Sequence, residues 1–312
     1  MRVLTKFRLS EVFMSAELFE TEVSYEDQES SIISVKKYQS PDIKTSILQV
    51  LSSIFLLLVC YGILYFGLSR HHYWMLVVAP LAAGLAIRTF TLQHDGGPGS
   101  LVRARGANNL TGRLCSLLTF TPYDHWQRHH GIHHSGWNNI DCRGRLSDMY
   151  SDCITVGEYR AMTPLKRGLY RLSKNPVVAL LLMPPIIFFV VYRIPFDTPR
   201  DWKRERYGVH LTNVALVVLY GSLAYWFNYK LVALVTLLVI YPASVIGVWL
   251  FLVQHKFEGV HWGHDATWDP FEASLTGCSF LRLPRILDWF SGSIGFHHVH
   301  HAAPGIPNYR LA

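Results

Sequence analysis

The chain has few charged residues and few cysteines. Only 16% of its 312 residues are charged, whereas soluble domains carry about 25%. The five cysteines form no C-x-x-C pair, which argues against both a secreted disulfide framework and a thiolate zinc site. No G-x-S-x-G motif occurs, so nothing supports a hydrolase with a nucleophile elbow. No short apolar segment near the start has the form of a signal peptide.

Long apolar runs are what the sequence has instead. Residues 46–68 contain no charge over 23 positions. A helix of that length extends roughly 34 Å, enough to cross a hydrocarbon core of about 30 Å. Three further runs of similar character lie at residues 73–93, 210–227 and 231–254. We therefore expect an all-α integral membrane protein with two transmembrane hairpins, that is, about four spanning helices.

The basic residues indicate how the chain is oriented. Of the 29 Lys and Arg, 11 lie between residues 94 and 175, six in the first 45 residues and five in 193–209. The turns at 69–72 and 228–230 hold only Arg70 and Lys230. The positive-inside rule then places both turns outside and the remaining polar segments in the cytosol. This explains the net charge of +7 without a nucleic-acid partner.

A fifth apolar run, residues 177–192, is shorter and contains Pro184-Pro185. If it spanned the membrane, residues 94–176 and 255–312 would lie on opposite sides. We expect it to be interfacial or re-entrant, so that both segments form one cytosolic helical cap. Residues 1–45 are polar and weakly patterned, and we expect a mobile tail before a membrane domain over residues 46–312.

Histidines are concentrated in two short clusters. Each contains the spacing H-x-x-H-H, at His130, His133 and His134 and at His297, His300 and His301. On a helix, positions i, i+3 and i+4 share a face, so the three imidazoles of each cluster can converge on a metal. Two more histidines, His94 and His255, stand at the predicted ends of the second and fourth spans. Eight imidazoles exceed one tetrahedral zinc site and suit two metal ions.

The motifs around these histidines resemble those of the membrane fatty acid desaturase family, most closely its bacterial acyl-lipid branch. The resemblance covers most of the chain from about residue 70. Its most specific part is the third histidine box with its flanks, residues 295–301 and 307–311. The other matching segments are residues 92–95, 130–134, 138–144, 253–258 and 283–287.

The resemblance implies a reaction and a set of ligands. Such enzymes use O2, two external electrons and two non-haem irons to introduce a cis double bond into an acyl chain. The branch suggests a membrane glycerolipid as substrate, and ferredoxin, flavodoxin or cytochrome b5 as separate electron donor. The implied iron ligands are His94, His130, His133, His134, His255, His297, His300 and His301. Asp95 and Glu258 would orient ligand imidazoles by hydrogen bonds, whereas His125, His129 and His298 are expected to face elsewhere.

Two departures from the family pattern affect the expected activity. The family's first box reads H-D-x-x-H, but here the final position is Pro98, within a Gly-Gly-Pro-Gly run that predicts a turn. One iron would then lack a histidine unless water or a nearby side chain replaces it, and a Pro98→His variant is expected to gain iron. The chain also ends 11 residues after His301, whereas family members usually continue.

Three alternatives to an active desaturase stay open at this point. One is a catalytically impaired homologue, as the two departures suggest. Another is a histidine-box hydroxylase or ketolase acting on carotenoids or alkanes. The last is a non-catalytic membrane protein that keeps the metal-binding fold as a scaffold.

Overall fold

A computed structural model describes residues 35–143 and 153–312. Residues 38–312 form one compact unit. The predicted tail, residues 1–45, therefore lies mostly outside the described residues, and its last three residues belong to the first long helix. Within the described ranges the regular structure is helical, with two isolated β-bridges. The prediction of an all-α membrane protein is confirmed.

Among the described residues, four helical segments are long and apolar enough to cross a membrane, and they contain the four predicted runs, except that the third ends at Trp226, one residue before the end of the run 210–227. The first hairpin consists of α2 (Ile43–Ser69), the 3-10 turn η1 (Tyr73–Val78) and α3 (Ala79–Gly96). The second consists of α9 (Lys203–Trp226) and α10 (Tyr229–His255). Large apolar side chains such as Leu48, Phe55 and Val217 are more than 60% exposed, as expected for surfaces that face lipid.

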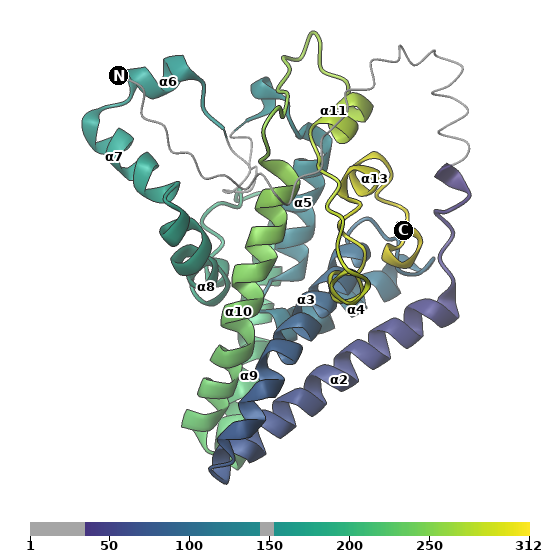
Figure 1. Cartoon of the computed structure of the whole chain (residues 1–312), viewed down its shortest axis with the longest axis vertical. Helices are drawn as coiled ribbons and strands as arrows, with labels where there is room; N and C mark the ends of the chain where they lie inside the picture. Colours follow the sequence, from purple (N-terminus) through teal and green to yellow (C-terminus); the bar gives the residue numbers. More distant parts are fainter. Residues whose placement is uncertain (1–34, 144–152) are drawn as a thin grey trace. The chain divides into compact units, whose positions relative to one another are not determined.

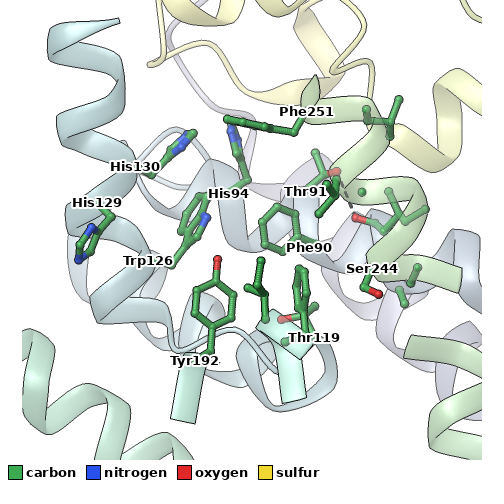
Figure 2. A pocket seen from close by; sticks show the side chains of 18 of the residues that line it. Phe90, Thr91, His94, Thr119, Trp126, His129, His130, Tyr192, Ser244 and Phe251 are labelled. Atoms are coloured by element: carbon green, nitrogen blue, oxygen red, sulfur yellow. Dashed lines mark hydrogen bonds between the residues drawn. The ribbon is translucent and has the colours of Figure 1, made fainter. Parts of the chain in front are cut away.

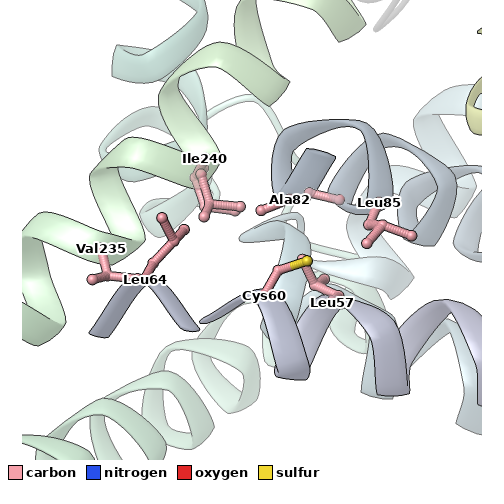
Figure 3. Close-up of a cluster of buried hydrophobic side chains, with 9 residues drawn as sticks. Leu57, Cys60, Leu64, Ala82, Leu85, Val235 and Ile240 are labelled. Atoms are coloured by element: carbon pink, nitrogen blue, oxygen red, sulfur yellow. The ribbon is translucent and has the colours of Figure 1, made fainter. Parts of the chain in front are cut away.

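The apolar core joins α2, α3 and α10. Leu57 and Leu64 of α2, Leu85 of α3 and Val239 of α10 are at most 2% exposed and belong to one cluster of contacting side chains (Figure 3). This packing holds the ends of α3 and α10 in a fixed relation, and those ends carry the histidines predicted from the sequence.

Shorter helices form the rest of the described fold. Between the two hairpins lie α4 (Arg105–Thr119), α5 (Tyr123–Gly136), η2 (Ile140–Cys142), α6 (Val156–Ala161), α7 (Pro164–Ser173), the π-helix η3 (Val177–Leu182), α8 (Met183–Phe189) and η4 (Val191–Arg193). After the second hairpin come α11 (Pro270–Thr276), α12 (Arg285–Ser291), α13 (His297–Ala302) and η5 (Asn308–Arg310). In Figure 1, α5 and α13 lie near the upper end of α10.

The fifth apolar run folds as η3, α8 and η4. Together with α7 it forms a bent pair with an angle of 61°. Pro184 and Pro185 stand in the first turn of α8, where a missing backbone N–H is tolerated. Whether this bent pair lies in the interface or re-enters the membrane stays a prediction.

Candidate metal centre

Two of the eight histidines stand at the ends of the central helices. His94 lies in the last turn of α3, and His255 is the last residue of α10. Their exposures are 6% and 1%. Because α3 and α10 pack against each other, both imidazoles are held at the same end of the helix pair.

The other six histidines come from α5 and α13. Helix α5 carries His130, His133 and His134, and α13 begins at His297 and continues through His300 and His301. In each helix the spacing turns the three imidazoles toward the partner helix. The structure therefore brings segments almost 170 residues apart in the sequence to one place, as the sequence predicted for the two boxes.

The eight imidazoles separate into two groups of four. In each group the four nearest ring nitrogens lie within 4.8 Å of one another. Group one consists of His94, His130, His134 and His300, and group two of His133, His255, His297 and His301. The groups are adjacent, because the rings of His134 and His301 stack with centroids 4.0 Å apart.

The two groups draw their histidines from α5 and α13 in the same pattern, with the roles of the two helices exchanged. Group one takes the i, i+4 pair of α5 and the middle histidine of α13, whereas group two takes the i, i+4 pair of α13 and the middle histidine of α5. Each group is completed by the histidine at the end of one central helix. The arrangement thus has approximate two-fold character, with four imidazoles for each of two positions.

The distances between ring nitrogens fit a shared metal ion. The Nε2 atom of His134 lies 3.0 Å from that of His130 and 3.1 Å from that of His300. In group two, the Nε2 atom of His255 lies 3.1 Å from that of His133 and 2.9 Å from that of His297. Ligands bound at about 2.1 Å from one ion are separated by about 3.0 to 3.4 Å in octahedral or tetrahedral geometry.

Burial keeps these imidazoles in the form that binds metals. It lowers the pKa of His133 to about 3, with a smaller effect from His94. Burial, together with the neighbouring imidazoles, also holds the pKa well below the ordinary value at His130, His134, His297, His300 and His301. A neutral imidazole offers a nitrogen lone pair to a cation, whereas imidazolium does not.

One buried Nε2 atom of the eight histidines also lacks a protein partner. Among the described residues, no hydrogen bond is made by Nε2 of His301. Buried polar atoms without partners are rare in folded proteins and call for an explanation such as an ion. The donor set, its protonation and its spacing all fit two metal ions bound by imidazoles.

The two carboxylates predicted to orient imidazoles differ in their surroundings. Asp95 is 1% exposed and accepts hydrogen bonds from the backbone N and the Nδ2 of Asn308, at 2.8 and 2.7 Å. Its Oδ1 atom is 3.8 Å from Nδ1 of His94, beyond hydrogen-bond distance. Glu258 is exposed after the end of α10. Their orienting roles stay predictions.

Pro98 lies in a turn, as predicted from the sequence. Helix α3 ends at Gly96, and Pro98 is exposed in the turn that follows. Since each group already has four imidazoles, the structure gives a reason to revise the expectation that a histidine at position 98 would add iron.

A cavity of about 350 Å³ adjoins both groups. His94 and His130 of group one and His297 of group two line it, and most of its wall is apolar. Figure 2 shows His94 and His130 beside the rings of Phe90, Trp126 and Phe251. Further apolar lining residues are Ala86, Ile87, Ile187, Phe188, Val191, Phe196, Ile240, Ala243, Val248, Leu250 and Ile294.

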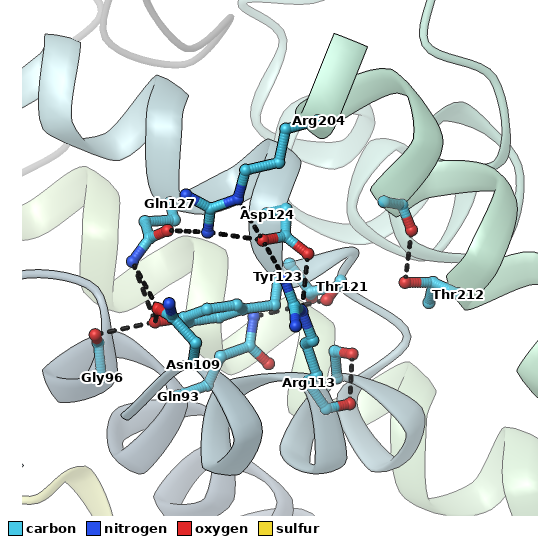
Figure 4. A network of polar contacts seen from close by, with 12 residues as sticks. Gln93, Gly96, Asn109, Arg113, Thr121, Tyr123, Asp124, Gln127, Arg204 and Thr212 are labelled. Atoms are coloured by element: carbon cyan, nitrogen blue, oxygen red, sulfur yellow. Dashed lines mark hydrogen bonds and ion pairs between the residues drawn. The ribbon is translucent and has the colours of Figure 1, made fainter. Parts of the chain in front are cut away.

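A network of polar contacts fixes the start of α5. The Asp124 carboxylate, 5% exposed, pairs with Arg113 of α4 at 2.8 Å and with Arg204 of α9 at 2.6 Å (Figure 4). Burial alone would raise the pKa of Asp124, but the hydrogen bonds and charges of both guanidinium groups outweigh it and hold that pKa below the ordinary value. Asp124 therefore stays ionised and ties three helices together near the histidines.

Two features of the site were not anticipated from the sequence. Asn308 links Asp95 to α2, since its side chain also exchanges hydrogen bonds with Gln49. His125 and His129, which were expected to face elsewhere, belong to neither group of four and converge on Asp197. The spacing H-x-x-x-H was visible in the sequence, whereas its carboxylate partner, 68 residues after His129, was not.

Comparisons of the sequence with known proteins point to one family. The family model described as fatty acid desaturase matches residues 71–312. A fatty acid desaturase of Bacillus subtilis is 34% identical over 277 residues, which cover 89% of this chain and 77% of that protein.

More distant relatives are matched over shorter shares of their length. A probable fatty acid desaturase of Sorghum bicolor is 27% identical over 239 residues, covering 71% of this chain and 57% of the relative. An sn-1 acyl-lipid omega-3 desaturase (ferredoxin) of Synechocystis is 24% identical over 238 residues, covering 71% of this chain and 61% of the relative.

Proposed function

The chain belongs to the fatty acid desaturase family, and from this premise we propose that it introduces a cis double bond into an acyl chain, using O2, two external electrons and a di-iron centre. The eight imidazoles of groups one and two would hold the two irons. The observation that carries the proposal is the placement of both groups against one apolar cavity.

The walls of the cavity suit a saturated chain. Phe90, Ile187, Ile240, Val248 and Phe251 offer apolar surface, against which methylene groups are buried at a gain of about 0.8 kcal/mol each. A chain threaded there would pass beside His94, His130 and His297. The protein would thus place two adjacent methylenes near both metal positions and exclude water from them.

The chemistry requires a metal because an unactivated methylene has no acidic proton. General acid–base catalysis cannot begin such a reaction. When bound, the two irons would allow O2 to act as the oxidant: two hydrogen atoms from the acyl chain, two external electrons and two protons reduce O2 to two waters. The chain's own contribution is to keep the imidazoles neutral, the substrate positioned and the pocket dry.

The remaining partners follow from the resemblance and the charge pattern. We propose a membrane glycerolipid as the acyl carrier and a separate donor such as ferredoxin, flavodoxin or cytochrome b5. The Synechocystis relative is named as a ferredoxin-dependent acyl-lipid desaturase, which supports this choice. The distribution of Lys and Arg supports placing the histidines on the cytosolic face.

Expression in a host that lacks the unsaturated product tests the proposal. Fatty acids are analysed by gas chromatography and mass spectrometry for the wild type and for His133→Ala and His300→Ala, one variant from each group. We expect acyl chains with two hydrogens fewer from the wild type and a much smaller amount of them from the variants. Hydroxylated products alone would indicate a hydroxylase or ketolase, and saturated lipids with iron-free protein would indicate an impaired homologue or a scaffold.

A further inference from the structure

Helix α5 carries a second pair of histidines on a different face. His125 and His129 are one turn apart, and their rings lie 4.3 Å apart. With 3.6 residues per turn, this pair points about 140° away from the pair His130 and His134. Both side chains are buried, at 5% and 8% exposure, so they are not simply solvated surface histidines.

Asp197 approaches this pair from the segment between η4 and α9. Its Oδ1 atom is 2.9 Å from Nε2 of His125, and its Oδ2 atom is 3.9 Å from Nε2 of His129. His125, His129 and Asp197 each offer one potential ligand atom, and these three atoms lie within 4.8 Å of one another. An ordinary hydrogen bond between His125 and Asp197 explains the 2.9 Å contact. It does not explain why the imidazole of His129 lies beside the same carboxylate.

The spacing suits one metal ion. Two imidazoles and a carboxylate, with positions left for other ligands, form a donor set used for zinc and for non-haem Fe²⁺. Ligands bound at 2.0 to 2.1 Å in a tetrahedron are about 3.3 Å apart, a value between the two measured contacts. The three donor atoms lie within 4.8 Å of one another, so the side chains would draw closer together when they bind an ion.

The surroundings hold the three donors in place. Thr198 donates a hydrogen bond to Oδ1 of Asp197 at 3.2 Å. Arg206 donates to the backbone oxygens of Pro195 and Thr198, at 2.9 and 2.7 Å, and so fixes the segment that carries Asp197. The ring of Trp202 packs beside His129. The donor side chains thus have defined positions on rigid supports.

We propose that His125, His129 and Asp197 bind one divalent transition-metal ion, Zn²⁺ or Fe²⁺, at a site separate from the eight-histidine centre. The three residues line the same cavity as that centre, and Figure 2 shows His129 on the side of the cavity opposite Ser244. The bound ion would join α5 to the segment before α9. This site does not depend on the proposed desaturation.

Metal stoichiometry tests the proposal directly. The purified full-length protein in detergent is saturated with Zn²⁺, freed of loosely bound metal by gel filtration, and analysed by mass spectrometry for zinc per chain. We expect Asp197→Asn, which preserves side-chain size, to bind one zinc fewer than the wild type. His129→Gln is expected to lose the same single equivalent.

The control variant is His264→Ala. His264 also pairs with a carboxylate, Asp141, at 3.1 Å, but both groups are exposed and no third donor joins them among the described residues. This variant should bind as much zinc as the wild type. Only protein that elutes as the native species is counted, so misfolded chains do not enter the ratio.

Equal zinc content in the wild type, Asp197→Asn and His129→Gln would overturn the proposal. That result would leave the proposed desaturase function untouched, because the readout is a metal count and not product formation. Conversely, a loss of one equivalent supports the site even in a chain that desaturates nothing.

Discussion

The two groups of four histidines use the same ligand rule but differ in exposure. All four members of group two are buried, with exposures between 1% and 7%, whereas His130 and His134 of group one keep part of their surface exposed. Group two also packs against Trp137, whose ring lies 4.2 Å from that of His255. The two metal positions therefore have similar donors and different access to solvent.

The number of imidazoles alone therefore does not decide how well a metal site tolerates the loss of one of them. Where solvent reaches a position, water can replace a lost imidazole. Where the position is enclosed by apolar rings, the loss leaves both a vacancy and unsatisfied buried groups. We therefore expect group two to be the less tolerant group.

The largest effect is expected for His297→Ala in group two. His297 is 2% exposed and borders the apolar cavity, where a water ligand is disfavoured, so the variant should lose iron and reduce product formation by about 100-fold. Iron per chain and product yield are measured together. The control is His298→Ala, which removes a neighbouring imidazole that packs on Phe280 outside both groups, and which should keep its iron. Product formation by His297→Ala close to the wild-type level would contradict the expectation that group two is the less tolerant group.

A smaller effect is expected for His134→Ala in group one. The partly exposed position allows water to take the place of the imidazole, and we expect product formation to fall about 10-fold with part of the iron retained. The same two measurements decide. If His134→Ala proves as damaging as His297→Ala, exposure does not distinguish the groups.

The support of group one can be weakened without touching a histidine. Asn308→Ala removes one of the two hydrogen bonds that Asn308 gives to the buried Asp95 carboxylate and leaves Gln49 without that partner. An unsatisfied buried group costs about 1 to 3 kcal/mol, so the melting temperature in detergent should fall. Tyr309→Phe, which loses only contacts to α2, should lower it less.

The smallest effect is expected for Pro98→His. The position is exposed in the turn after α3, and both groups already hold four imidazoles, so iron per chain should stay the same. A gain of iron would show that group one is short of a ligand and would break the approximate symmetry of the centre.

Much of the fold could be predicted from the sequence because a lipid environment restricts which backbone structures are stable. Charge-free runs such as residues 46–68 must be helical within a membrane, since no water is available for backbone groups. The four runs lie within the long helical segments, apart from the last residue of the run 210–227. Helical spacing likewise predicted that the histidines of each box would share a face, and the turn at Pro98 followed from its Gly-Gly-Pro-Gly run.

What the sequence did not reveal depends on how distant segments dock. The division of each box between two groups arises from the crossing of α5 and α13 and from the ends of α3 and α10, and no local pattern encodes it. The convergence of Asp197 on His125 and His129 has the same origin. Asn308 could be read only as part of a motif, not as the partner of Asp95.

Because α5 supplies ligands to both groups, the two metal positions are not mechanically independent. A small rotation of this helix about its axis would move His130 and His134 in one group and His133 in the other at the same time. The spacing between the two groups therefore depends on the geometry of α5 and equally on that of α13, which also carries histidines of both groups. A motion of α5 that rearranges one group must therefore also rearrange the other.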